Sequence, residues 1–203
     1  MQQSERSLDV YTRLMGELKM RLSILERNIG RAETGKTYRN EEVVLLESRC
    51  LQLRKVLELL AFSSLVAHRE LLAQVHEDLA TMQKAKNVIK RLEKRSPHFF
   101  PNPVRGVVTP QGLHFKERTG SDVFTKEDFI PLFDACSGAL HIANPLSSSN
   151  PINIGRPFRE WIERIKNLLQ EHSVLLSQDK VIFVNMLAWD ITQVQVFSAE
   201  ADR

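Results

Sequence analysis

Two side chains of opposite charge interrupt an apolar stretch near residue 56. Arg54 and Glu58 lie four residues apart, so they share one face of any helix that contains them. An unpaired charge is costly to bury, which favours contact between these two side chains or with a neighbouring helix. His141 ends another apolar helical stretch, just before a long loop. Arg54, Glu58 and His141 are the candidate catalytic residues. The alternatives are a structural ion pair and a helix-terminal histidine.

The densest charge feature is a basic run near the middle of the chain. Lys86, Lys90 and Lys94 are four residues apart and form one stripe on a helix. The segment 98–100, His-Phe-Phe, follows at once, and aromatic rings can stack on nucleic-acid bases. The stripe is therefore a candidate nucleic-acid-binding site. The alternative is a solvated helix end whose cations complement the helix dipole.

Known signatures of phosphate, nucleotide and metal binding are absent from the sequence, including GxxxxGK[ST], GxGxxG, HExxH and CxxC. We therefore expect no cofactor and no metal site. The two cysteines, Cys50 and Cys136, lie in apolar helical stretches and are interpreted as buried, reduced thiols. A secreted disulfide framework needs more cysteines, and no signal peptide is recognised, so we expect a cytoplasmic protein. No apolar stretch approaches the roughly 20 residues of a membrane span, so we expect no membrane association.

Charge is distributed unevenly along the 203 residues, although the net charge is only +3. Residues 1–120 contain 21 Lys and Arg against 14 Asp and Glu, whereas the remainder contains 7 against 11. This asymmetry permits an anionic partner for the first half, such as a nucleic acid, without requiring one.

The elements that must position these residues begin with a helix over residues 4–30. Its apolar residues are spaced alternately three and four apart, which is the spacing of a heptad seam. The seam consists of Leu8, Tyr11, Met15, Leu18, Leu22, Leu25 and Ile29. Such a seam packs against another long helix, either in the same chain or in a second copy. We take it as the basis for predicting a homodimer.

Two further long helices are predicted over residues 41–67 and 69–94. The first of them is apolar on two faces, which is typical of the central helix of a bundle. No glycine or proline separates the two helices, so the pattern leaves open whether they are continuous. Pro97 and the prolines that follow it end the second helix.

The second half of the chain mixes helices with strands. Val-rich segments flank Pro110-Gln111-Gly112 and predict a β-hairpin over residues 104–118. Helices are predicted over 126–143 and 157–177, and alternating residues predict a C-terminal β-hairpin over 181–197. The sequence therefore predicts one α+β domain over residues 1–203. It consists of four or five bundled helices with a small antiparallel sheet made from one or both hairpins.

Two segments, residues 53–60 and 129–145, resemble helices of the HEPN group of all-helical bundle domains. The resemblance implies a helical bundle that is frequently a homodimer. It also implies a ribonuclease or nucleotide-binding activity linked to toxin–antitoxin or phage-defence systems. The catalytic pattern of the family is an arginine followed, after four to six residues, by a histidine. Arg69 with His76 fits this spacing, as does Arg91 with His98, whereas His141 is preceded by Asp134, Ala135 and Cys136 where the arginine should stand.

Two classes of function therefore remain open. The first is a non-catalytic binding or assembly protein that dimerises through its long helices, and we favour it because no convincing acid–base pair or nucleophile emerges. The second is a HEPN-like ribonuclease or nucleotide-binding protein that uses Arg54, Glu58 and His141, or the Arg69–His76 pair.

Overall fold

The computed structural model describes residues 2–34, 39–68, 85–95, 98–110, 112–141, 153–177, 180–191 and 193–200. In this part of the chain the helices are α1 (Gln2–Thr34), α2 (Arg39–Ala67), α4 (Ala85–Arg95), α5 (Lys126–Ala139) and α6 (Phe158–Leu169). The strands are β1 (Asn102–Thr109), β2 (Gly112–Glu117), β3 (Glu171–Ser177), β4 (Lys180–Asn185) and β5 (Gln195–Glu200). The predicted α+β class, mostly helical with an antiparallel sheet, is confirmed.

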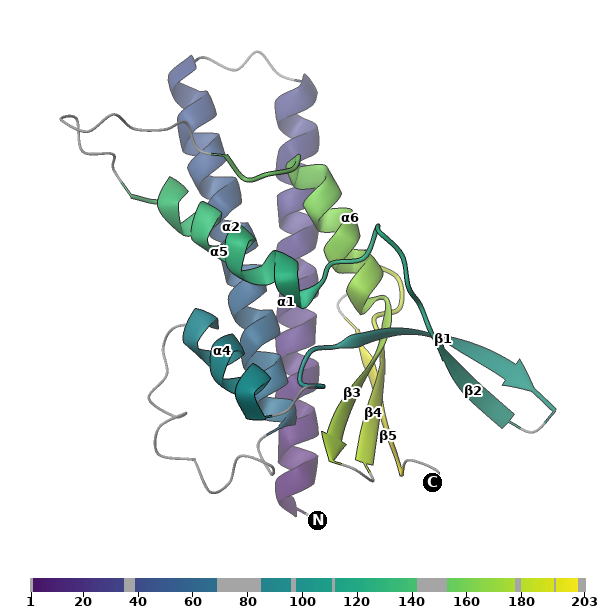
Figure 1. The fold of residues 1–203 in the computed structure, drawn as a ribbon. Coiled ribbons are helices and arrows are strands. Elements are labelled where there is room, and N and C mark those ends of the chain that lie inside the picture. Colours follow the sequence, from purple (N-terminus) through teal and green to yellow (C-terminus); the bar gives the residue numbers. More distant parts are fainter. Residues whose placement is uncertain are drawn as a thin grey trace.

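The long helices α1 and α2 form an antiparallel pair that runs the length of the molecule (Figure 1). The predicted seam of α1 lies at the centre of this pair, and its residues from Tyr11 to Ile29 are at most 8% exposed. They join one hydrophobic core with α2 residues such as Leu53, Leu57 and Leu60. The seam that suggested a homodimer is therefore occupied within the same chain.

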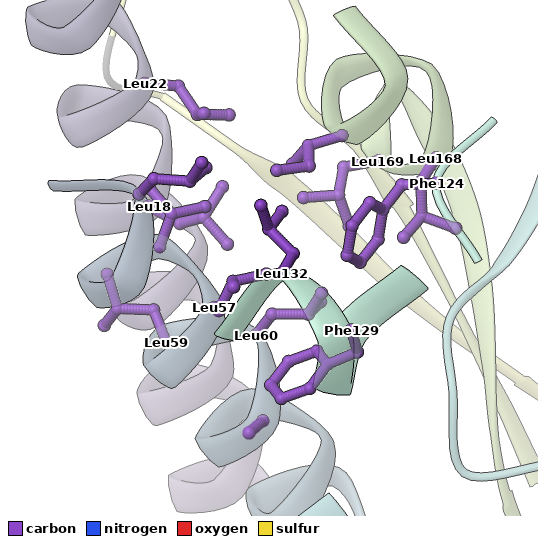
Figure 2. Close-up of a cluster of buried hydrophobic side chains, with 14 of the residues drawn as sticks. Leu18, Leu22, Leu57, Leu59, Leu60, Phe124, Phe129, Leu132, Leu168 and Leu169 are labelled. Carbon is purple, nitrogen blue, oxygen red and sulfur yellow. The ribbon is translucent and has the colours of Figure 1, made fainter. Parts of the chain in front are cut away.

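Helices α5 and α6 complete the helical core. Figure 2 shows Phe129 and Leu132 of α5 beside Leu57 and Leu60 of α2. The start of α5 has a capping box, in which the backbone N–H of Thr125 donates to the Asp128 carboxylate at 3.0 Å. The same carboxylate accepts a hydrogen bond from Arg164 of α6 at 2.8 Å. One side chain thus caps α5 and ties it to α6.

The third predicted long helix, over 69–94, lies partly outside the described residues, as do Arg69 and His76. Its final part is α4, which presents Ala85, Val88, Ile89 and Leu92 to the core. The predicted helix over 126–143 corresponds to α5, which ends at Ala139, and residues 142–143 lie outside the described part.

All five strands belong to one antiparallel sheet with the order β2-β1-β3-β4-β5. The hairpin predicted over 104–118 is β1–β2, and the one predicted over 181–197 corresponds to β4–β5. Strand β1 pairs with β3 only at Asn102 and Pro103, and then with β2 from Val104 to Thr109. The hairpin is therefore attached to the rest of the sheet through a short pairing, and it projects away from the helices (Figure 1).

The prediction of one helix over 157–177 is wrong in its second half. Helix α6 ends at Leu169, and residues 171–177 form β3. His172 fits the helical spacing of the preceding apolar residues, which is why the pattern appeared continuous. It also fits a strand, since His172 and Val174 are buried while Glu171, Ser173 and Leu175 are half-buried. Pairing with β4 along this segment decides in favour of the strand.

The three strands β3–β5 have one face turned toward the helices and one turned away. His172, Val174, Ile182 and Val184 are buried and point inward, and Tyr11 of α1 contacts His172. The alternate residues, among them Glu171 and Phe183, therefore point outward. We call this second side the outer face of the sheet.

We predict that truncating the α1 seam destabilises the single chain. Leu18 is fully buried, so Leu18→Ala should lower the free energy of unfolding by about 3 kcal/mol, through lost burial and an unfilled cavity. Leu51 on α2 is 41% exposed, and Leu51→Ala should cost less than about 1 kcal/mol. Urea unfolding of the two variants beside the parent measures both values. Equal losses would contradict this placement of the seam.

Candidate functional site

Arg54 and Glu58 are partners, as their spacing predicted. Arg54 Nε donates to Glu58 Oε1 at 3.2 Å, and Lys55 Nζ donates to Glu58 Oε2 at 2.9 Å. The Arg54 guanidinium also lies 5.3 Å from the ring centre of Phe133 on α5. The Arg54 and Glu58 side chains are 34% and 17% exposed, so the pair lies at the edge of the core and is partly solvated. It links α2 to α5 where these helices cross.

His141 lies in the exposed turn that follows α5. Its backbone N–H donates to the Gly138 carbonyl at 3.2 Å. Its ring makes no hydrogen bond or ion pair with the described residues. Arg54 and Glu58 bind each other, and neither binds His141. A shared catalytic role for the three residues therefore stays a prediction, and so does a role for the Arg69–His76 pair.

Of the three lysines of the basic stripe, one is bound in an ion pair and two are exposed. Lys86 binds Asp134 of α5 at 2.5 Å, which ties α4 to α5, whereas Lys90 and Lys94 are exposed. Phe99 is fully buried and Phe100 packs on Phe124, at 6.4 Å between ring centres. Phe99 and Phe100 therefore pack with the core, and of the predicted aromatic segment only the His98 ring is exposed.

A different constellation, which the sequence analysis did not identify, lies on the outer face of the sheet. Phe115 of β2 stacks on Phe183 of β4 with 3.6 Å between ring centres and 10° between planes. Phe183 is in register with Phe197 of β5, which is 57% exposed. These rings, with Glu171 and Asn185, line a hollow of about 290 Å³, here called the phenylalanine hollow.

A second hollow adjoins it along β3. Asn102 of β1, Glu117 of β2 and Ser173 of β3 line it, together with His98, Phe100 and Leu175, and its volume is about 360 Å³. Asn102 Nδ2 donates to Glu117 Oε1 at 2.8 Å. We call it the asparagine hollow. Both hollows lie between the outward side chains of the sheet and the β1–β2 hairpin.

The sequence could have predicted one residue of this site, but not the contacts between its strands. The alternation of the last strand places Phe197 opposite the buried side of the sheet. The contact of Phe115 with Phe183, however, joins residues that are 68 positions apart and carries no local signal.

The other groups capable of chemistry form a buried polar cluster beneath the inner face. The Tyr11 hydroxyl lies 2.8 Å from His172 Nε2, and His172 Nδ1 lies 2.8 Å from the Leu169 carbonyl. Nδ1–H therefore donates to the carbonyl, and Nε2 accepts from Tyr11. Burial lowers the pKa of His172 to about 4, although the Leu169 carbonyl opposes the shift. His68 lies nearby, fully buried, and burial lowers its pKa as well.

The two cysteines, expected to be buried and reduced, are both free and buried. They meet between α2 and α5, where the Cys136 thiol donates to the Cys50 sulfur and lowers the pKa of Cys50. The same contact, together with burial, raises the pKa of Cys136. Among the described residues, no three His, Cys, Asp or Glu side chains are grouped as metal ligands. None of the described helices is both long and apolar enough to cross a membrane.

We predict that breaking the Arg54–Glu58 pair has a small energetic effect. Glu58→Gln should lower the free energy of unfolding by less than about 1 kcal/mol, because the pair is partly solvated. Asp128→Asn should cost more, about 2–3 kcal/mol, because Arg164 is only 9% exposed and Asp128 also caps α5. Urea unfolding compares the two. A larger loss for Glu58→Gln would show that this pair is buried.

We also predict acid sensitivity that depends on His172. Its pKa is lower in the folded chain than in the unfolded chain, so its contribution is complete above about pH 6.5. It should fall by about 3 kcal/mol as the pH drops toward 4, because the unfolded chain then takes up the proton. His172→Gln should flatten this dependence in urea unfolding, apart from the part due to His68. His114→Gln, which alters an exposed ring, should leave it unchanged, and an unchanged slope in His172→Gln would contradict the assignment.

Comparison with known proteins adds no relative: no protein-family model, curated protein or solved structure matches this chain. Inference about its function therefore depends on the geometry described above.

Proposed function

We propose that this protein is a non-catalytic binding protein that takes a partner protein on the outer face of its sheet. The observation that carries this proposal is the phenylalanine hollow, with Phe115 and Phe183 stacked in its wall and Phe197 left largely exposed beside them. Gathered aromatic rings at a hollow on the surface are typical of an interaction site.

The arrangement of the hairpin supports this proposal. An antiparallel sheet can leave one face to water, but that face is usually polar. Here the β1–β2 hairpin lies over only part of the outer face, through the contact of Phe115 with Phe183. Phe197 and Gln195 of β5 remain exposed beside it. The hairpin and the strands thus form the walls of the phenylalanine hollow, which is large enough to take side chains of a segment bound along the outer face.

The location of the reactive side chains supports a non-catalytic role. Tyr11, His172, Cys50 and Cys136 are at most 1% exposed, so they are committed to the interior. His141, Lys90 and Lys94 are exposed but belong to different elements or lack acid–base partners among the described contacts. The side chains that line the two hollows are suited to binding through packing and hydrogen bonds. Ser173, His98 and Glu117 all line the asparagine hollow, but among the described contacts no hydrogen bond joins Ser173 to either potential base, and Glu117 instead accepts from Asn102.

Three further proposals follow from the sequence and have narrower support. Self-association would need a surface other than the α1 seam, and Val43, Val44 and Leu51 on α2 form the exposed apolar alternative. Nucleic-acid binding would rest on Lys90 and Lys94. A HEPN-like ribonuclease or nucleotide-binding role would rest on Arg54, Glu58 and His141, of which the first two form an ion pair, or on the pair Arg69 and His76. The free thiols are consistent with the proposed cytoplasmic location.

The proposal is tested by selecting binding partners from a display library of random twelve-residue peptides. Peptides enriched on the parent protein should lose at least tenfold in affinity on Phe197→Ser, because the exposed ring forms part of the site. Leu51→Ser is the matched control, since Leu51 is a comparably exposed apolar residue on α2. Titration calorimetry measures both.

Two results would contradict the proposal. One is a set of peptides that depend on Leu51 and ignore Phe197, which would move the site to α2. The other is the recovery of no specific peptide from the parent protein at all.

A further inference from the structure

We propose that the partner segment is basic, with arginine or lysine side chains that enter the two hollows of the outer face. This inference rests on the proposed function and adds the chemistry of the partner to it. It follows from the charges that line the hollows, the way one carboxylate is held, and the spacing of the hollows along β3.

The charged side chains that line the two hollows are acidic. Among the described residues that line them, the phenylalanine hollow contains Glu171 and the asparagine hollow contains Glu117, and neither contains a lysine or an arginine. The chain as a whole has more basic than acidic residues, 28 against 25, so these sites differ from the average surface. Arg105 and Lys116 of the hairpin are in register with each other and out of phase with Gly106 and Phe115. They therefore point to the opposite side of the hairpin.

Glu171 is held in a fixed position between the two walls. Its Oε2 accepts a hydrogen bond from the Gly106 N–H of the hairpin at 3.1 Å, and its Oε1 accepts from Asn185 Nδ2 of β4 at 3.5 Å. A carboxylate offers about four acceptor positions, so lone pairs remain for a ligand. A carboxylate held in place beside aromatic rings is suited to a cation, because the ammonium or guanidinium group gains a charged partner.

The rings complete the recognition of such a side chain. Arginine and lysine carry aliphatic stems that pack on apolar surface while the charged group reaches a polar partner. Phe115, Phe183 and Phe197 offer that surface around Glu171. The face of an exposed ring such as Phe197 also attracts a cation directly. A neutral polar side chain would gain neither the ionic contact nor the attraction to the ring.

The two hollows are spaced for an extended segment. Glu171 and Ser173 are alternate residues on the same face of β3, roughly 7 Å apart by strand geometry. Ser173 lies in the asparagine hollow and is in register with Asn102, which binds Glu117. An extended peptide also repeats every second residue on one side. A segment with basic residues at alternate positions therefore places one cation in each hollow.

The test uses three acetylated and amidated hexapeptides, in which threonine alternates with arginine, glutamine or glutamate. Binding is followed by the shifts of the aromatic ¹H–¹³C signals of Phe115, Phe183 and Phe197 during titration at low salt. We expect the arginine peptide to bind at least tenfold more tightly than the glutamine peptide, and the glutamate peptide not to bind. Glu171→Gln should weaken the arginine peptide at least fivefold, whereas Glu127→Gln, which alters an exposed carboxylate on α5, should not.

The possible outcomes separate the two proposals. If the arginine and glutamine peptides bind equally well and both lose affinity for Phe197→Ser, the inference of a basic partner is overturned. The proposal that the outer face binds a partner would then still stand. No shift of the three rings with any peptide would contradict both. If Glu171→Gln fails to fold by circular dichroism, Glu117→Gln in the asparagine hollow replaces it, because Glu117 is exposed. An unchanged affinity in that variant would then overturn the inference.

Discussion

The ammonium group of Lys19 is enclosed between α1 and the C-terminal part of the sheet, where it donates hydrogen bonds to the backbone carbonyls of Met186 and Gln193. The residue is 1% exposed, and burial lowers the pKa of Lys19 while nearby Asp190 opposes the shift. A buried ammonium without partners would cost several kcal/mol. These hydrogen bonds hold the residues that follow β4 and precede β5 against α1, and together with the Tyr11–His172 contact they keep the buried face of the sheet turned toward the helices.

Strand β3 shows how that constraint divides structural from binding roles. Glu171 and His172 are adjacent, so their side chains point to opposite faces. His172 is sealed against Tyr11 and holds the sheet on the helices. Glu171 reaches the outer face and bridges the hairpin to β4. The histidine of this pair therefore stabilises the fold from the interior, while the glutamate on the outer face remains available to a partner.

Local sequence patterns were sufficient to predict most of the helices and strands, but they could not predict the contacts between these elements. The seam of α1 and the Arg54–Glu58 pair could be predicted because each depends on residues a few positions apart on one helix. The end of α6 was mistaken because His172 satisfies both helical and strand spacing, and only pairing with β4 distinguishes them. The outer face was missed for the same reason, since stacking of Phe115 depends on a strand 68 residues away.

The contacts between the first helix and the last strands also bear on the order in which the molecule is made. Tyr11, Lys19 and Ser23 have their partners at His172, Met186 and Trp189, more than 160 residues later in the chain. At a bacterial or eukaryotic ribosome, that interval takes roughly 10–30 s of translation. During this time α1 and α2 can pair, but the polar groups of α1 remain exposed to water. On the nascent chain, the side of α1 that later contacts the sheet therefore stays uncovered until β3, β4 and β5 have been synthesised. During this interval it is accessible to chaperones.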